Sequence, residues 1–404
     1  MNFRYLWGSS ASSTLADGIL LAGAPLLAIT MTRSPSLVSL VSMAMTLPWL
    51  LLALHAGAIA DRLDRRRIMV VANVLRAAAL GITAAAAAFD LLTVPVLIAI
   101  MLICGTAEVF AATAAQSVLP MVVPADKLST ANGRLFATQT VGHNFAGAPV
   151  AGVLVGVLPV AVFGAPALLY GAAGLLLLGM RGRFRTENVS TKPLRADIGE
   201  GLRYLAGHRV IRSLSIWSGM VNLANSAFFA VFVLWAVGPH SRIGVEPGLF
   251  GLVTSVLAVG AILGSLVATR VAAMFGEGPT IVVASLVNAL LLLMPVLVPT
   301  VWALFVAAPI IGATNTMTNV IGISLRQRVV PERLLARVNS AGRLIGMGGA
   351  PLGALGGGLL GELAGLPAVF YTAVGICVSA SVLLWRNLAA AKSAPVPEPA
   401  PAAV

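Results

Sequence analysis

The sequence has little charge, few aromatic residues and almost no cysteine. Charged residues make up 10% of its 404 residues and aromatic residues 6%, whereas 58% are hydrophobic and the mean hydropathy is +0.96. A soluble globule of this length would lack the polar side chains needed to cover its surface. Cys104 and Cys377 both lie inside apolar runs, which argues against a disulfide framework or a cysteine metal site. These shortages leave the class of polytopic membrane proteins.

The formal net charge of +12 does not indicate a nucleic-acid partner. The basic residues gather in segments between apolar runs, and no basic stripe follows a continuous surface. The first apolar run, residues 9–31, has no small-residue cleavage site of the usual kind. We therefore predict that it is a retained membrane span and not a signal peptide.

Windows of about 20 residues, long enough to cross a hydrocarbon core of about 30 Å, predict about twelve helices. They cover residues 9–31, 36–60, 68–89, 93–115, 135–158, 160–180, 213–237, 247–269, 279–298, 300–325, 338–361 and 367–385. The predicted fold is an all-α membrane protein with six-helix bundles at residues 1–180 and 213–386. Residues 181–212 are predicted to be a cytoplasmic linker, and residues 387–404 a disordered cytoplasmic tail.

The basic residues also predict the orientation. If both termini lie in the cytoplasm, all 26 lysines and arginines except Arg33, Arg76 and Arg242 fall in cytoplasmic segments. Short cytoplasmic loops carry an excess of Lys and Arg, so this asymmetry favours an orientation with both termini inside.

The two halves of the chain resemble each other. Val122–Pro124 matches Val329–Pro331, and Gly57 matches Gly264, at one constant spacing of 207 residues. Several matches in the same order indicate a duplicated six-span unit. An even number of spans in each unit makes the two halves parallel, which is an arrangement typical of secondary transporters.

One dense charged block, GAIADRLDRRR at residues 57–67, separates two apolar runs. It resembles the signature loop between the second and third helices of the major facilitator superfamily, with Asp64 where many members have Gly. The matching residues are Gly57, Asp61, Arg62, Arg65 and Arg66. The stretches SSTLADG (12–18), GTAEVF (105–110) and ANGRL (131–135) are similar to the branch with macrolide exporters, siderophore exporters and related drug:proton antiporters.

The resemblance implies that this loop is a conformational latch. Gly57 permits close helix approach, and Asp61 would contact the eleventh helix in the outward-facing state. Arg337 or Arg343 is its expected partner there. A plain topology anchor is the alternative, and it accounts for the arginines but not for Asp61 and Asp64.

Three ionisable residues lie inside predicted spans, where each charge costs about 2.5 to 3.5 kcal/mol on insertion scales. Asp17, Arg76 and Glu108 all lie eight or nine residues from the cytoplasmic ends of their helices, about 12 to 14 Å deep. Arg76 and Glu108 could pair, and Asp17 would face the cavity if the family fold holds. Such a cluster could bind and release a proton; the alternative is a static ion pair with a helix-packing Asp.

The second half offers amides where the first has ionisable groups. At the repeat spacing Glu108 falls on Asn315, and Asp17 falls beside Asn225. We therefore expect the first half to handle protons and the second to offer neutral hydrogen bonds, although helix packing alone also places Asn in spans. The predicted substrate cavity comprises Asn222, Asn225, Asn315, Asn319, Phe228, Met317 and His143.

The stretch GHNFAGAPVAG at residues 142–152 resembles the antiporter signature Gly-Pro-x-x-Gly-Gly, from which Ala148 and Ala151 depart. No GxxxxGK loop appears, and no catalytic or metal-ligand grouping converges, so neither ATP drive, nor an enzyme, nor a cofactor is expected. The resemblance implies a monomeric, proton-coupled exporter of amphipathic small molecules among the lipids of a bacterial cytoplasmic membrane. A dedicated siderophore, metabolite or lipid carrier and a non-transporting membrane sensor are the alternatives.

Overall fold

The computed structural model describes residues 2–124, 127–185, 194–330 and 332–392. The side chains of a few helical residues in these ranges, Asp61, Arg337 and Arg343 among them, lie outside the description. Its elements are α1 (Asn2–Met31), α2 (Pro35–Arg62), α3 (Arg65–Ala88), α4 (Val94–Val122), α5 (Leu128–Thr140), the π-helix η2 (Val141–Gly147), α6 (Ala148–Val157), α7 (Ala161–Leu178), α8 (Leu194–Gly207), α9 (Arg209–Ala236), α10 (Pro247–Phe275), α11 (Glu277–Leu291), α12 (Met294–Leu297), α13 (Val301–Val329), α14 (Glu332–Ala364) and α15 (Leu366–Lys392).

Within the described residues, 11 helical stretches are long and apolar enough to cross a membrane, and the 33-residue helix α14 completes the predicted set of about twelve. The predicted all-α membrane fold is therefore confirmed. The fifth span consists of α5, η2 and α6 in succession. Most helices run past their predicted ends, and α15 continues to Lys392 instead of stopping near 385, because Leu388 and the alanines after it favour helix.

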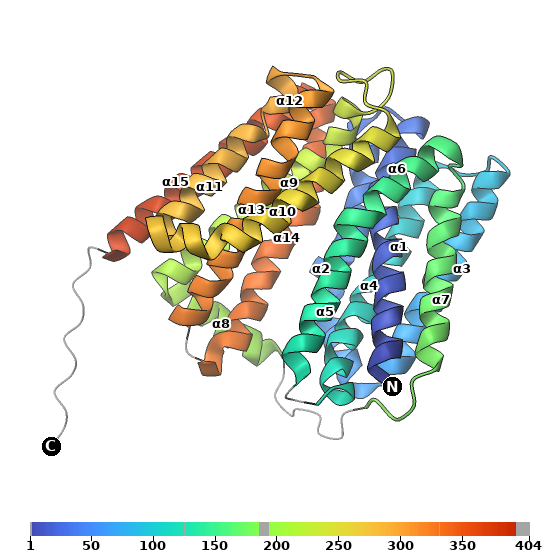
Figure 1. Ribbon diagram of the computed structural model, residues 1–404, viewed down its shortest axis with the longest axis horizontal. Helices are drawn as coiled ribbons and strands as arrows, with labels where there is room; N and C mark the ends of the chain where they lie inside the picture. Colours follow the sequence, from blue (N-terminus) through green and yellow to red (C-terminus); the bar gives the residue numbers. More distant parts are fainter. Residues whose placement is uncertain (1, 125–126, 186–193, 331, 393–404) are drawn as a thin grey trace.

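The helices form two bundles that repeat one arrangement (Figure 1). Helix α2 packs on α4 in the first bundle, as α10 packs on α13 in the second, and α1 packs on α7 as α9 packs on α15. A β-carbon at Gly105 would meet the backbone oxygen of Met45 at 2.5 Å, and one at Gly312 would overlap the backbone of Leu257. The glycines matched by the repeat thus bring equivalent helix pairs into contact, and the two bundles are parallel repeats.

The two ends of the molecule differ. The N-terminus and α8 lie at the lower end in Figure 1, which we call the linker face, and the bundles converge toward the opposite end, which we call the closed face. Between the bundles, α2 packs on α14 and α6 packs on α10. A β-carbon at Gly358 would overlap Ser39, and one at Gly348 would lie 3.1 Å from Leu50, whereas one at Gly57 would meet no described atom within 4 Å. Contacts between α2 and α14 therefore extend from Ser39 near the closed face to Leu50.

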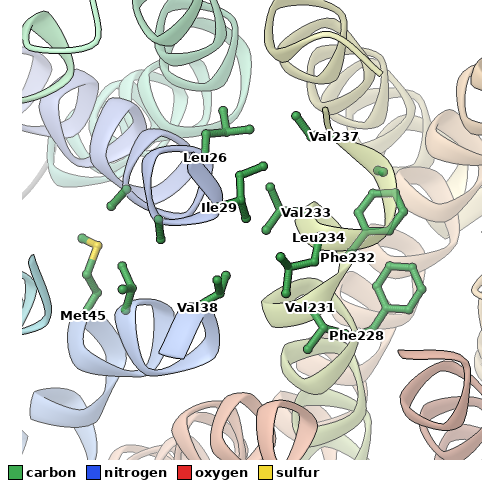
Figure 2. Close-up of a cluster of buried hydrophobic side chains, with 14 of the residues drawn as sticks. Leu26, Ile29, Val38, Met45, Phe228, Val231, Phe232, Val233, Leu234 and Val237 are labelled. Carbon is green, nitrogen blue, oxygen red and sulfur yellow. The ribbon is translucent and has the colours of Figure 1, made fainter. Parts of the chain in front are cut away.

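Hydrophobic side chains seal the closed face. Figure 2 shows Leu26 and Ile29 of α1 beside Val233 of α9, with Val38 of α2 next to them. These four side chains are buried in one cluster that joins the two bundles. The burial of apolar surface stabilises this contact by about 25 cal/mol for each Å² removed from water.

A polar network closes the same face at its rim. The hydroxyl of Ser34 donates a 2.7 Å hydrogen bond to Glu362 Oε2, and the backbone N–H of Ser36 donates to the same oxygen at 3.3 Å. The hydroxyl of Ser36 donates to the backbone oxygen of Gly358. The α1–α2 connection of the first bundle is thereby bonded to α14 of the second.

Closure at this face is expected to weaken in acid. The hydrogen bond from Ser34 lowers the pKa of Glu362, whereas a carboxylate facing water after the bundles separate titrates in its usual range. The stabilisation of the closed face by Glu362 is therefore complete at a pH above the usual pKa range of a glutamate. It is lost as the pH falls through the lowered pKa of the closed state. Spin labels at Leu37 and Leu363 should report a longer distance in acid.

In the Glu362→Gln variant the short label distance of the closed state should be less populated, and its population should no longer depend on pH. The prediction would be contradicted if the protein with Glu362 intact kept the same distance distribution from neutral pH to below the pKa range of carboxyl groups.

Candidate functional site

A buried ion pair links the first bundle's helices α1 and α3. Arg76 Nη1 lies 3.1 Å from Asp17 Oδ1, and the Tyr170 hydroxyl of α7 donates a 2.5 Å hydrogen bond to the same oxygen. The guanidinium of Arg76 also lies 4.7 Å from the centre of the Tyr170 ring. The Arg76 side chain is 2% exposed and that of Asp17 11%, so the two charges are paired largely inside the protein.

The predicted pair between Arg76 and Glu108 does not form. Arg76 pairs with Asp17 instead, because Tyr170 holds the Asp17 carboxylate on the side that faces α3. Glu108 of α4 is half-buried and forms no ion pair or hydrogen bond with any residue that the structure describes, but it lines the same cavity. Sequence reasoning missed Tyr170, although it is the only polar side chain of α7 and one of four tyrosines in the chain.

This cluster holds one more carboxyl group than cations. Asp17 and Glu108 carry two negative charges when ionised, and Arg76 carries one positive charge. An uncompensated charge at membrane depth costs about 2.5 to 3.5 kcal/mol on insertion scales. Uptake of one proton would leave these three side chains with no net charge.

The π-helix η2 fits against α1 beside this cluster. A β-carbon at Gly18 would lie 2.5 Å from the backbone oxygen of Gly142, and one at Gly147 would lie 2.5 Å from the backbone of Gly18. The contact brings His143 Nε2 to 4.0 Å from Asp17 Oδ2. Single π-turns inside α-helices occur frequently at functional sites.

Two cavities meet at His143. The first, which we call the acidic cavity, measures about 450 Å³ and contains Asp17, Arg76 and Glu108 in its wall. The second, the central cavity, measures about 380 Å³ and lies between the bundles, with walls from α1, α2, η2, α6, α9, α10 and α14. His143 lines both. The walls of the central cavity are mainly apolar and include Leu21, Pro25, Phe229, Val233, Phe250 and Leu257.

A third cavity of about 280 Å³, the amide cavity, lies inside the second bundle. All four predicted asparagines line it: Asn222 and Asn225 from α9, and Asn315 and Asn319 from α13. In each helix they follow one face, three or four residues apart, as an aligned polar stripe requires.

Two residues predicted for the cavity lie elsewhere. Phe228 is 3% exposed, stacks on Phe232 and contacts the tilted ring of Phe370 inside the core, while its neighbour Phe229 faces the central cavity. Met317 packs in a hydrophobic cluster of the second bundle. Hydropathy places aromatic and Met side chains in a span but does not give the direction in which each one points.

The charged block is tied to its own bundle. Arg66 donates hydrogen bonds to the backbone oxygens of Leu177 and Leu178 at the end of α7, at 2.8 and 2.6 Å. Asp64 caps α3 by accepting from Arg67 N–H, and its other oxygen accepts from the N–H of Phe184. These contacts give Asp64 a structural role inside the first bundle. The topology-anchor alternative had left the presence of Asp64 unexplained.

The remaining latch residues are placed as follows. Arg65 is buried, and its backbone N–H donates to the Phe184 oxygen, whereas Arg62 is exposed. A β-carbon at Gly57 would meet no described atom within 4 Å. The side chains of Asp61, Arg337 and Arg343 lie outside the described residues.

The chain matches a family model over residues 1–400, described as transmembrane secretion effector. It is 26% identical over 368 residues to the multidrug efflux pump Tap of Mycolicibacterium fortuitum, covering 88% of each chain. It is 25% identical over 143 residues to the macrolide efflux protein A of Streptococcus pyogenes, covering 35% of each chain.

Solved structures share the fold at low sequence identity. The nucleoside transporter NupG is 14% identical with a TM-score of 0.78, covering 98% of this chain and 100% of its own. A bacterial homologue of the lysosomal transporter Spinster, in an inward-facing and occupied conformation, is 14% identical with a TM-score of 0.75, covering 98% of each chain. The neighbours are transporters and not enzymes.

Proposed function

Because this chain is an efflux transporter of the transmembrane secretion effector family, within the major facilitator superfamily, we propose that it exports amphipathic small molecules in exchange for protons. The central cavity carries this proposal. It lies between the two parallel bundles, it is mainly apolar, and it has a few polar groups such as Thr46, Ser226 and Thr254 in its wall. Sites of this kind bury the apolar body of a ligand and orient it with few hydrogen bonds.

The linker face is the cytoplasmic face in this proposal. The basic block at the end of α2 and the start of α3 lies there with the N-terminus, as the positive-inside rule requires of cytoplasmic segments. With the opposite face sealed, the conformation is inward-facing. Export then requires the two bundles to rock about the central cavity, so that the closed face opens and the linker face closes.

Asp61 acts as the latch of the outward-facing state in this proposal, with Arg337 or Arg343 as its partner. A β-carbon at Gly57 would meet no described atom within 4 Å in this conformation, which supports a role confined to the other state. The arginines Arg65 and Arg66 hold the loop to the first bundle.

Proton exchange takes place at the acidic cavity. Asp17, Arg76 and Glu108 supply the charges, and His143 extends from the π-helix toward Asp17 while facing the central cavity. A substrate in the central cavity therefore lies next to the group that contacts the proton site. This proximity supports coupling without direct contact between the substrate and Asp17.

The proposal is tested with the purified protein in proteoliposomes carrying an imposed pH gradient. A panel of macrolides, cationic dyes and siderophores is offered. For each compound, movement in the direction opposite to the flow of protons is followed. We expect amphipathic drugs to move, and a protonophore to stop them. Substrate movement that is indifferent to the protonophore would reject proton coupling, and transport of siderophores alone would favour a dedicated carrier.

A further inference from the structure

The amide cavity holds hydrogen-bonding groups that no protein partner occupies. The side chains of Asn225, Asn315 and Asn319 make no hydrogen bond with the residues that the structure describes, and Asn222 makes one, to the Ser218 backbone oxygen at 3.0 Å. Asn222, Asn315 and Asn319 are exposed to the cavity although they lie in membrane spans. Amides that served helix packing would be bonded across to a neighbouring helix.

Arg326 adds a positive charge to the same cavity. It lies eleven residues after Asn315 on the same face of α13, about 16 Å nearer the linker face. Its Nε atom is buried without a hydrogen-bond partner among the described residues, and so is the hydroxyl of Ser215 on α9. A β-carbon at Gly342 of α14 would lie 3.2 Å from Arg326 Nη1 and 3.7 Å from Ser215 Oγ. The guanidinium therefore lies against α14 where that helix has no side chain.

The charge of this cavity is opposite to that of the acidic cavity. Its described wall contains no carboxylate, and no acidic residue that the structure describes forms an ion pair with Arg326. Arg328, two residues later, is different: it forms an ion pair with Glu277 and does not line the cavity. A buried donor left without a partner is unfavourable, and a planar guanidinium is suited to bind an oxyanion with two parallel hydrogen bonds.

We propose that the amide cavity is a binding site for the acidic group of an amphipathic substrate. The carboxylate pairs with Arg326 near the linker face, and acceptor and hydroxyl groups of the same molecule bond to the asparagines deeper in the cavity. This inference rests on the proposed export function, because it assigns the substrate class of the same transporter. It makes the preferred substrates acids or zwitterions, not simple cations.

The test compares two dyes that differ in one group. Rhodamine 6G is an ethyl ester, and rhodamine 19 is its free acid with the same ring system. Binding of each dye to the full-length protein in nanodiscs of neutral lipid is measured by fluorescence polarisation, without any pH gradient. We expect the acid to bind about tenfold more tightly than the ester, as one charge-assisted hydrogen-bonded pair allows.

Arg326→Gln should remove this preference by weakening the acid and leaving the ester unchanged, so the ester's affinity reports that the variant is folded. Arg328→Gln is the matched control and should keep the preference. Asn319→Asp, on the same face of α13, should weaken the acid more than the ester, because the new carboxylate repels the carboxylate that only the acid carries. The inference is overturned if the native chain does not prefer the acid, if Arg326→Gln retains the preference, or if Arg328→Gln loses it equally. Because dye binding is measured without a pH gradient, its result does not depend on whether transport is coupled to protons.

Discussion

Replacing Asp17 with asparagine should abolish efflux driven by a pH gradient, with a fall of at least about a hundredfold. The substitution leaves Arg76 buried without its counter-charge and weakens the bond from Tyr170. Breaking a buried ion pair from one side costs about 3 to 5 kcal/mol of stability, whereas the fall in efflux follows from the loss of a proton-binding carboxylate. Dye efflux from proteoliposomes with an inwardly directed proton gradient measures the loss, and a thermal shift measures the change in stability.

Two further variants separate folding from coupling. Asp17→Asn combined with Arg76→Gln removes both charges of the pair, and it should recover stability while transport follows the substrate gradient alone. Glu108→Gln removes a carboxylate that has no ion pair in the described structure, so it should keep stability and reduce coupling. Proton-coupled efflux that survives neutralisation of both Asp17 and Glu108 would refute the role given to this cluster.

Replacing Gly18 with alanine should both destabilise the protein and reduce coupled efflux by about tenfold or more. The new β-carbon would meet the Gly142 oxygen at 2.5 Å and the Cα of His143 at 2.9 Å, and these are backbone atoms that cannot rotate away. Overpacking of this kind costs about 1 to 3 kcal/mol. It also pushes η2 from α1 and moves His143 away from Asp17, so the variant should lose coupling and not only stability.

Gly8 provides a control on the same helix. A β-carbon there would meet only the flexible end of Leu176, at 3.4 Å, which is ordinary contact. Gly8→Ala should therefore keep transport and gain slightly in helix propensity, by up to about 1 kcal/mol. The prediction for Gly18 fails if the two alanine variants have the same melting temperature and the same pH dependence of efflux.

The spans and the repeat could be predicted from the sequence, but the rotation of each helix could not. Hydropathy placed Asp17, Arg76 and Glu108 at one depth, and all three line one cavity. Depth along a helix axis does not say which carboxylate faces the guanidinium. The choice of Asp17 depends on Tyr170, which is separated from it by 153 positions in the chain.

The amide stripes were predictable because the spacing of Asn315 and Asn319 gives them one helix face. The π-helix was not, since its extra residue per turn leaves no mark in composition. It is seen only in the structure, where Gly142 and Gly147 of this segment lie against α1. Likewise, the sequence showed a run of arginines but not the free carbonyls at the end of α7 that Arg66 caps.

The position of His143 in the walls of two cavities has a thermodynamic consequence. If a ligand in the central cavity changes the affinity of the acidic cavity for a proton by some factor, protonation must change the affinity for that ligand by the same factor. The reciprocity holds for any ligand that contacts the imidazole, whatever its chemical class. Substrates of unrelated shape can therefore be linked to protonation through the same side chain, provided that each of them contacts the imidazole.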